Sequence, residues 1–232
     1  QRHVMLRHLG LAGKAVIVDE CHAYDAYMDR YLDSALSYLG TYRVPVILLS
    51  ATLPKARREE LLRAYARNKK LPFSPNVPDG TYPLISWTQD QTIRAAAVPS
   101  AGGSRTVDVC RVDEEQALAA AAAALAHGCV GIVVNTVRRA QALHDLLRTR
   151  CPQAQILLDH SRFLAPDLAA HEKEILAHVG KRSTPDARAG VLVIGTQVLE
   201  QSLDLDFDLL ITDLCPMDLL LQRIGRLHRH TR

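Results

Sequence analysis

The sequence of 232 residues predicts an α/β fold built on mainly parallel sheets. Short apolar runs alternate with segments of helical periodicity, which is typical of strands joined by crossover helices. A hydrophobic content of 48% is enough for substantial cores. Polar residues also follow directly after apolar runs, as Asp19 and Glu20 do, and open α/β sheets bind ligands at the carboxyl ends of their strands.

The strands are expected in short apolar runs rich in β-branched residues. These runs are Lys14–Val18, Val44–Leu49, Val130–Val134, Val191–Gly195 and Leu209–Thr212. Apolar or alanine-rich spacing indicates helices between them. The expected helices are Tyr24–Leu39, Lys55–Asn68, Glu114–His127, Arg138–Arg150 and Leu219–Arg229.

The composition of the chain changes between Leu71 and Arg105, where prolines are frequent and two adjacent glycines occur. This composition indicates a linker or an irregular crossover. We therefore expect an N-terminal α/β piece over residues 1–70, a connection over 71–105 and a C-terminal α/β domain over 106–232.

Composition excludes several classes of protein. No apolar run reaches the roughly 18 residues that span a bilayer, and the first residues lack the order of a signal peptide, so we expect a cytoplasmic protein with no membrane partner. The five cysteines are scattered without a CxxC pair, which favours reduced thiols. A net charge of +3 does not by itself indicate a polyanion partner, although basic residues crowd the last ten positions.

Asp19 and Glu20 follow the apolar run Lys14–Val18. One carboxylate at a strand end could hold a hydrated Mg²⁺ while the other orients an attacking water, as in nucleotide hydrolysis. An acidic turn after a buried strand is the alternative. A zinc site at Cys21 and His22 is disfavoured, because adjacent residues chelate poorly and no second ligand pair is present.

The last residues carry a second pattern. If residues 219–229 are helical, Gln222, Arg226 and Arg229 share one stripe and apolar residues line the opposite one. Such a helix would present two guanidinium groups, which suit a phosphate in transit. A solvated basic helix is the alternative.

Four motifs in order carry a family resemblance. DECH at 19–22, SAT at 50–52, GTQVLEQSLDLD at 195–206 and QRIGRLHR at 222–229 resemble motifs II, III, V and VI of superfamily 2 DExH helicases. Together with HSRF at 160–163, the last two look like the CRISPR-associated helicase-nuclease of type I (subtype I-E-like) systems. The resemblance spans essentially the whole chain.

The resemblance implies two RecA-like parallel-sheet lobes with ATP bound in the cleft between them, the first lobe incomplete and the second nearly complete. It implies that Asp19 holds Mg²⁺ through water, that Glu20 activates the hydrolytic water and that His22 couples the site to the second lobe. Ser50 and Thr52 would link hydrolysis to movement on the strand.

In the second lobe the resemblance makes Arg226 and Arg229 the arginine fingers and places Gln222 against the nucleotide. Asp204 would lie near the ribose or the opposing motif. The nucleic-acid contacts would come from Thr196, Gln197, Asn135, Thr136, His160 and Arg162. For the last four, ordinary loop polarity explains the residues equally well.

Two features expected of a complete protein of this kind are not found in the sequence. No GxxxxGK[ST] loop precedes DECH, so we expect the chain to begin inside the first lobe and not to hydrolyse ATP alone. His144 and Asp145 supply an HD dipeptide without the further His and Asp residues of a metal-dependent nuclease.

The resemblance thus implies an ATP-dependent 3′-to-5′ translocase on single-stranded DNA, acting in antiviral CRISPR interference with a Cascade-type surveillance complex. A DExH helicase of DNA repair or RNA metabolism is one alternative. A RecA-like binding module without catalysis is another.

Overall fold

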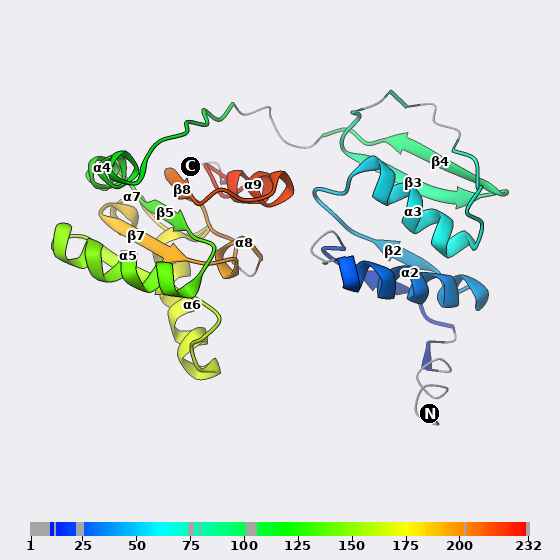
Figure 1. Cartoon of the computed structure of the whole chain (residues 1–232), viewed down its shortest axis with the longest axis horizontal. Helices are drawn as coiled ribbons and strands as arrows, with labels where there is room; N and C mark the ends of the chain where they lie inside the picture. Colours follow the sequence, from blue (N-terminus) through cyan, green and yellow to red (C-terminus); the bar gives the residue numbers. More distant parts are fainter. Residues whose placement is uncertain are drawn as a thin grey trace. The chain divides into compact units, whose positions relative to one another are not determined.

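The computed structural model describes residues 10–11, 13–21, 26–73, 77–78, 80–100, 106–201 and 203–230. The chain divides into two compact units, Gln1–Arg105 and Thr106–Arg232 (Figure 1). Strands and helices alternate along most of both units, which confirms the predicted α/β class. No helix in the described ranges has the length and apolar character that crossing a membrane requires.

Unit 1 begins with two strands and two helices in alternation. They are β1 (Val16–Val18), α2 (Ala26–Thr41), β2 (Val46–Leu48) and α3 (Lys55–Ala66). The strands pair in parallel, with Val16 opposite Val46 and Val18 opposite Leu48. A parallel pair needs a crossover connection, and the 16-residue α2 supplies it.

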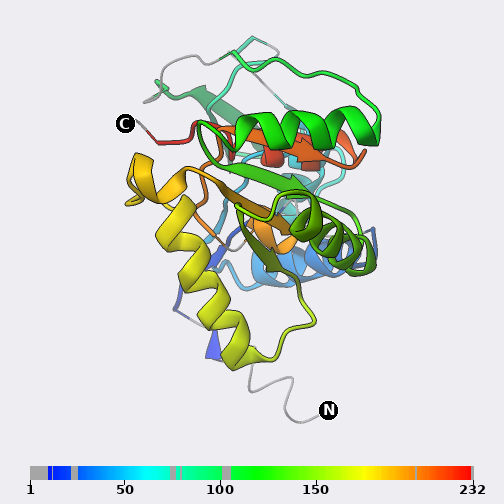
Figure 2. The ribbon, with the colours of Figure 1, turned by 90° about the vertical axis from the view of Figure 1, so that its left-hand side faces the viewer.

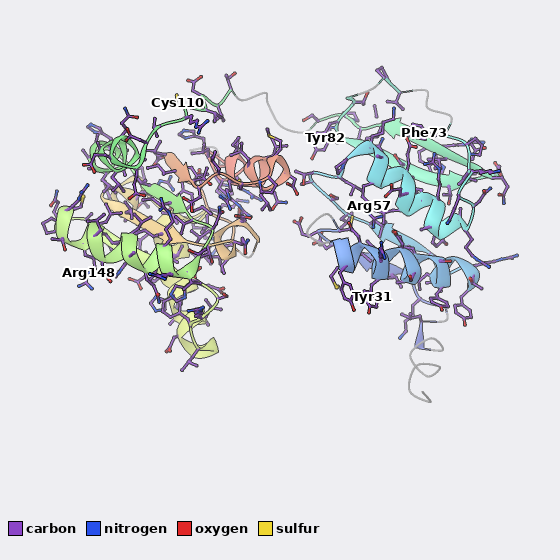
Figure 3. All side chains as sticks on the ribbon, in the orientation of Figure 1. Tyr31, Arg57, Phe73, Tyr82, Cys110 and Arg148 are labelled. Atoms are coloured by element: carbon purple, nitrogen blue, oxygen red, sulfur yellow. The ribbon has the colours of Figure 1, made fainter. Side chains whose placement is uncertain are left out.

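Helices α2 and α3 pack together around a small core. Leu36 and Leu61 are each 1% exposed, and Cys21 lies in the same cluster. Arg57 on α3 ties the helices together, because its guanidinium pairs with Asp29 at 3.1 Å and with Asp33 at 2.9 Å (Figure 3). The outward side chains of the strands, such as Ile17 and Ile47, are exposed.

A β-hairpin follows, where the sequence indicated an irregular crossover. Strands β3 (Leu84–Gln89) and β4 (Thr92–Ala97) pair antiparallel across Asp90 and Gln91, which both have φ near +50°, as tight hairpin turns require. The prolines flank the two strands and do not interrupt them. A half-buried strand usually alternates apolar and polar residues. The sequence of β3 does not show this alternation, because Ser86 faces the partly buried side while the apolar Trp87 faces out.

Unit 2 holds a parallel sheet with the strand order β6-β7-β5-β8 in its described part (Figure 2). The strands are β5 (Val130–Val133), β6 (Gln155–Asp159), β7 (Val191–Gly195) and β8 (Leu209–Thr212). The helices are α4 (Glu114–Ala124), α5 (Val137–Arg150), α6 (Ala165–Val179), α7 (Pro185–Arg188), α8 (Val198–Gln201) and α9 (Met217–Ile224). Strand β6 and helices α6, α7 and α8 were not predicted.

Helices cover both faces of this sheet, as a parallel sheet requires. Ile132 and Ile194 point to one face and pack with residues of α4 and α5. Val133 and Val193 point to the other face, where they meet Ile175 of α6 and other buried residues. The two central strands β5 and β7 are buried throughout, so their only accessible polar groups lie beyond the strand ends.

We expect Gly40→Ala to destabilise unit 1. A Cβ atom at Gly40 would lie 1.9 Å from the carbonyl oxygen of Tyr65, which is main chain and cannot rotate away. Forcing extra volume into such a contact costs about 1–3 kcal/mol. Denaturant unfolding followed by the fluorescence of Trp87, the single tryptophan of the chain, reports on this unit.

Gly10→Ala is the matched control, because a Cβ atom there meets nothing within 4 Å. An unchanged unfolding midpoint for Gly40→Ala would contradict the close approach of α2 and α3.

Candidate functional site

Asp19 and Glu20 lie at the carboxyl end of β1. The NH of Leu49 donates to the carbonyl of Val18 at 2.9 Å, and the NH of Cys21 donates to the carbonyl of Leu49 at 3.1 Å. The strand pair therefore holds the acidic turn from both sides. Both acidic residues are exposed, and Asp19 Oδ1 accepts the NH of Glu20 at 2.9 Å.

Glu20 adopts a left-handed backbone conformation with φ of 51°. Side chains other than glycine rarely take this conformation, and such positions cost about 1–3 kcal/mol each and cluster at functional sites. The turn thus keeps a glutamate where the backbone favours glycine, which motivates a role for its carboxylate.

Ser50 and Thr52 follow β2 at the same edge, because the two strands are parallel neighbours. Burial raises the pKa of the Cys21 thiol, and a hydrogen bond with the Ser50 side chain partly offsets that rise. Cys21 thus joins the acidic turn to Ser50. The Thr52 hydroxyl is buried and has no hydrogen-bond partner among the described residues. His22 lies outside the described residues.

Thr196 and Gln197 occupy the corresponding edge in unit 2, directly after β7. Thr196 is 6% exposed, and its NH donates to the carbonyl of Asp159 at 3.3 Å. Gln197 is exposed. The short helix α8 begins at the next residue, so Gln197 is the more accessible of the two.

Asn135 and Thr136 follow β5 and contribute to local structure. The side-chain Nδ2 of Asn135 donates to the carbonyl of Leu214 at 2.9 Å, and the main-chain NH of Asn135 donates to the Asp213 carboxylate at 3.0 Å. Thr136 caps α5 by accepting the NH of Arg139. Both residues are nevertheless exposed.

His160 is 3% exposed, whereas Arg162 is exposed. The His160 ring stacks on Phe163 with a centroid distance of 4.2 Å, and Phe163 stacks on His171 at 4.6 Å. The carboxylate of Asp159 is buried beside this stack, and burial raises its pKa. Arg162 is therefore the accessible member of the two predicted strand contacts here.

The helix predicted over residues 219–229 is confirmed only for residues 219–224 and is wrong beyond them. Helix α9 ends at Ile224, and Gly225 caps it. The following turn forms a bridge with Phe207, because Phe207 NH donates to the carbonyl of Arg226 at 2.8 Å and His228 NH donates to the carbonyl of Phe207 at 3.1 Å. Gln222, Arg226 and Arg229 therefore do not form one helical stripe.

The buried cation of this segment is Arg223, whose side chain is 0% exposed. Its Nε donates to Glu200 Oε1 at 2.7 Å, and its Nη2 lies 2.6 Å from the same oxygen. It also donates to the Thr212 hydroxyl, to the carbonyl of Asp213 at 3.2 Å and to Asn135 Oδ1 at 3.3 Å. The sequence alone indicates no role for Arg223 or Glu200, which are marked only by their place inside two of the motifs.

Arg226 and Arg229 sit in different surroundings. Arg226 is partly buried and donates to the main-chain carbonyls of Leu203 and Glu200. Arg229 pairs with Asp204 at 2.9 Å, and both side chains are about half exposed, at 44% and 48%. Gln222 is partly buried. The structure thus brings Asp204 to Arg229 within unit 2.

The comparisons with known proteins point to one family. The family described as "CRISPR-associated nuclease/helicase Cas3, C-terminal" matches residues 126–232. The chain carries a Cas3-like C-terminal helicase domain. This confirms the resemblance to the CRISPR-associated helicase-nuclease family.

Similarity to Cas3 proteins covers nearly all of the chain. It is 42% identical over 236 residues to the CRISPR-associated nuclease/helicase Cas3 of Streptococcus thermophilus and 37% identical over 243 residues to the Cas3 endonuclease/helicase of Escherichia coli K12. These matches cover 99% and 100% of this chain but 25% and 27% of those relatives. The chain therefore spans about a quarter of their length.

Solved Cas3 structures share the fold. The crystal structure of T. fusca Cas3-ATP superposes with a TM-score of 0.81 at 34% identity, covering 98% of this chain and 28% of that one. A crystal structure named "CRISPR-associated protein" gives a TM-score of 0.84 at 41% identity, covering 98% of this chain and 26% of that one. The four-stranded parallel sheet matches the RecA-like C-terminal lobe of Cas3 structures.

We expect the thiols of Cys21 and Cys129 to resist alkylation in the folded Cas3-like chain. Burial raises the pKa of both thiols, that of Cys129 to about 12. The thiolate is the nucleophile, so at pH 8 only about one Cys129 in 10⁴ would be ionised. Peptide mass spectrometry after iodoacetamide treatment measures this.

Cys110 is exposed (Figure 3) and provides the internal control. Modification of Cys21 as fast as that of Cys110 in the native protein would show that the acidic turn is not packed as described.

Proposed function

We propose that this chain supplies a fragment of the helicase core of a CRISPR-associated nuclease/helicase that, at full length, hydrolyses ATP and moves 3′ to 5′ on single-stranded DNA. The observation that carries the proposal is the position of the motif residues at the carboxyl ends of β1, β2 and β7, in a chain similar over 98% of its length to a structure named Cas3-ATP. The proposed divisions are residues 1–70 and 106–232 for the two lobes, with 71–105 connecting them.

Unit 1 supplies the carboxylates of the proposed reaction. Asp19 and Glu20 are exposed oxygen donors on a turn held by backbone hydrogen bonds, and hard carboxylate oxygens suit Mg²⁺. Mg²⁺ usually keeps several waters and is held by one or two carboxylates together with substrate phosphates. Asp19 would hold the ion, which would neutralise charge on the phosphates, and Glu20 would take a proton from the attacking water. His22, Ser50 and Thr52 would couple the site to movement.

Unit 2 supplies the arginines, with Gln222 near the nucleotide. An arginine donates to phosphate in a fixed fork and stays charged. The ion pair of Arg229 with Asp204 is half exposed, and pairs of this kind stabilise a protein by only about 0–1 kcal/mol. Arg229 can therefore leave Asp204 for a phosphate at small cost. Arg226 stays anchored on two carbonyls.

The strand contacts would come from the same edge of unit 2. Gln197 and Arg162 are exposed there, as are Asn135 and Thr136. Neutral hydroxyl and amide groups bind phosphates and sugars without reading sequence, which suits a motor that moves along any strand. Thr196 and His160 are buried and would act through the main chain or through their neighbours.

A Cascade-type complex is the proposed partner in the interference against foreign DNA. A solved structure named "CRISPR RNA-guided surveillance complex, pre-nicking" contains a chain that matches this one with a TM-score of 0.78 at 36% identity, covering 98% of this chain and 30% of that one. The likeness supports recruitment to a guide complex.

In the full-length protein, Glu20→Gln should abolish ATP turnover and leave nucleotide binding nearly unchanged. The amide keeps the shape of the side chain but cannot accept the proton, and general-base catalysis contributes about 10²–10⁴-fold. Phosphate release and binding of a fluorescent ATP analogue measure the two effects.

Glu115→Gln is the control, because Glu115 is an exposed glutamate paired with Arg150 on the surface of unit 2. Turnover of Glu20→Gln within threefold (about 0.7 kcal/mol) of the unmodified protein would remove Glu20 from the mechanism.

Arg229→Ala in the full-length protein should lower ATP turnover by about 10³-fold, the effect of a phosphate-contacting arginine. Folding should be little affected, since the ion pair that is lost is half exposed. Single-turnover hydrolysis and the thermal midpoint are the measurements.

Arg148→Ala is the matched change, because Arg148 is an exposed arginine on α5 (Figure 3). Equal turnover for the two variants would argue that Arg229 does not contact the nucleotide.

A further inference from the structure

Arg223 and Glu200 form a buried ion pair at the carboxyl edge of the unit 2 sheet. Their side chains are 0% and 1% exposed. Burying two charges costs more than their attraction returns unless further hydrogen bonds satisfy them. Arg223 meets this condition because its guanidinium also reaches Asn135, the Thr212 hydroxyl and the carbonyl of Asp213. Glu200 meets it only in part, because its Oε2 is buried without a hydrogen-bond partner among the described residues.

The partners of Arg223 come from three separate segments. Asn135 follows β5, Thr212 and Asp213 end β8, and Glu200 lies on α8 after β7. One side chain from α9 therefore ties together the ends of three neighbouring strands. These are the same segments that carry Thr136 and Gln197, two of the proposed strand contacts.

Glu200 contacts Arg223 of α9 and Arg226 of the turn that follows it. Its carboxylate pairs with Arg223, and its main-chain carbonyl accepts from Arg226. Helix α8 has only four residues and begins immediately after Gln197. Gln197 therefore lies about one helical turn before Glu200, whose carbonyl holds Arg226. A movement of Gln197 on binding nucleic acid would reach that carbonyl through α8.

We propose that the Arg223–Glu200 pair is a positioning element. When a nucleic-acid strand binds at residues 196–197, the pair transmits the resulting change of position to the turn that carries Arg226 and Arg229. The proposal rests on the function proposed above and names the regulation of that site. Arg223 touches neither strand nor nucleotide and acts through Glu200.

The geometry requires an arginine. Its planar fork bonds to several acceptors at once, whereas lysine offers a compact point charge on a flexible stem. Arg223→Lys therefore keeps the charge beside Glu200 but loses the simultaneous link to the ends of β5 and β8.

The test is strand-stimulated ATP hydrolysis by the full-length protein, with a single-stranded DNA oligonucleotide as the probe. The readout is the ratio of turnover with saturating DNA to turnover without it. We expect Arg223→Lys to lower this ratio about tenfold, within the usual range of coupling between two sites. Partial unfolding would reduce both turnovers equally and leave the ratio unchanged.

Arg188→Lys is the matched control. Arg188 is also a buried arginine in unit 2, with a side chain 3% exposed, and it pairs with Asp208 at 3.1 Å. Asp208 directly precedes β8 and accepts the NH of Cys129, which precedes β5, so this pair lies at the opposite edge of the same sheet. We expect Arg188→Lys to lower the thermal midpoint without changing the ratio.

A double-mutant cycle adds a second readout. If the two side chains act as one unit, Arg223→Gln combined with Glu200→Gln should lower the ratio no more than about twofold beyond the worse single variant. Multiplicative losses would show that the two side chains act independently and would overturn the proposal.

An unchanged ratio for Arg223→Lys, or an equal fall for Arg188→Lys, would also overturn it. If the unmodified full-length protein shows no ATP hydrolysis stimulated by single-stranded DNA, the proposed function itself fails. The two failures are therefore distinguishable.

Discussion

The complete burial of β5 and β7 is the constraint on which unit 2 depends. Because apolar residues of these strands point to both faces of the sheet, every functional polar group must stand beyond a strand end. The parallel register places those ends at one edge. Many polar groups then compete for little space, and a single guanidinium, that of Arg223, satisfies acceptors from three segments. Neutralising that one charge therefore links the segments that follow β5, β7 and β8.

Much of this fold could be predicted from the sequence. The apolar runs at Val130–Val134, Val191–Gly195 and Leu209–Thr212 became strands within one residue of their expected ends, because a strand buried on both faces must be apolar throughout. Strand β6 escaped prediction because it lies at the sheet edge and has polar residues at both ends. The hairpin of unit 1 escaped it because apolar and polar residues do not sort cleanly between its two faces: Ile93 is fully buried, whereas Ile85 and Trp87 face outward.

The candidate site was predictable in position and less so in geometry. Strand ends located Asp19, Glu20, Ser50 and Thr196 by a local rule. The period of residues 219–229 suggested one helix, but α9 ends at Ile224. The residues after Gly225 instead form hydrogen bonds with Phe207, and these contacts join residues about twenty positions apart. The partner of Arg223 was equally hidden, since any of 25 acidic residues could have paired with it.

The exposed Arg229–Asp204 pair has a consequence for how this protein would respond to its ionic surroundings. Attraction between accessible charges decays over about 8 Å at physiological ionic strength and over a shorter distance as salt is added. This screening removes more energy from a contact with a multiply charged phosphate than from one with a single carboxylate. Concentrated electrolyte would therefore favour the internal partner. Asp204 would then act as a built-in competitor that retains the guanidinium whenever counterions are abundant.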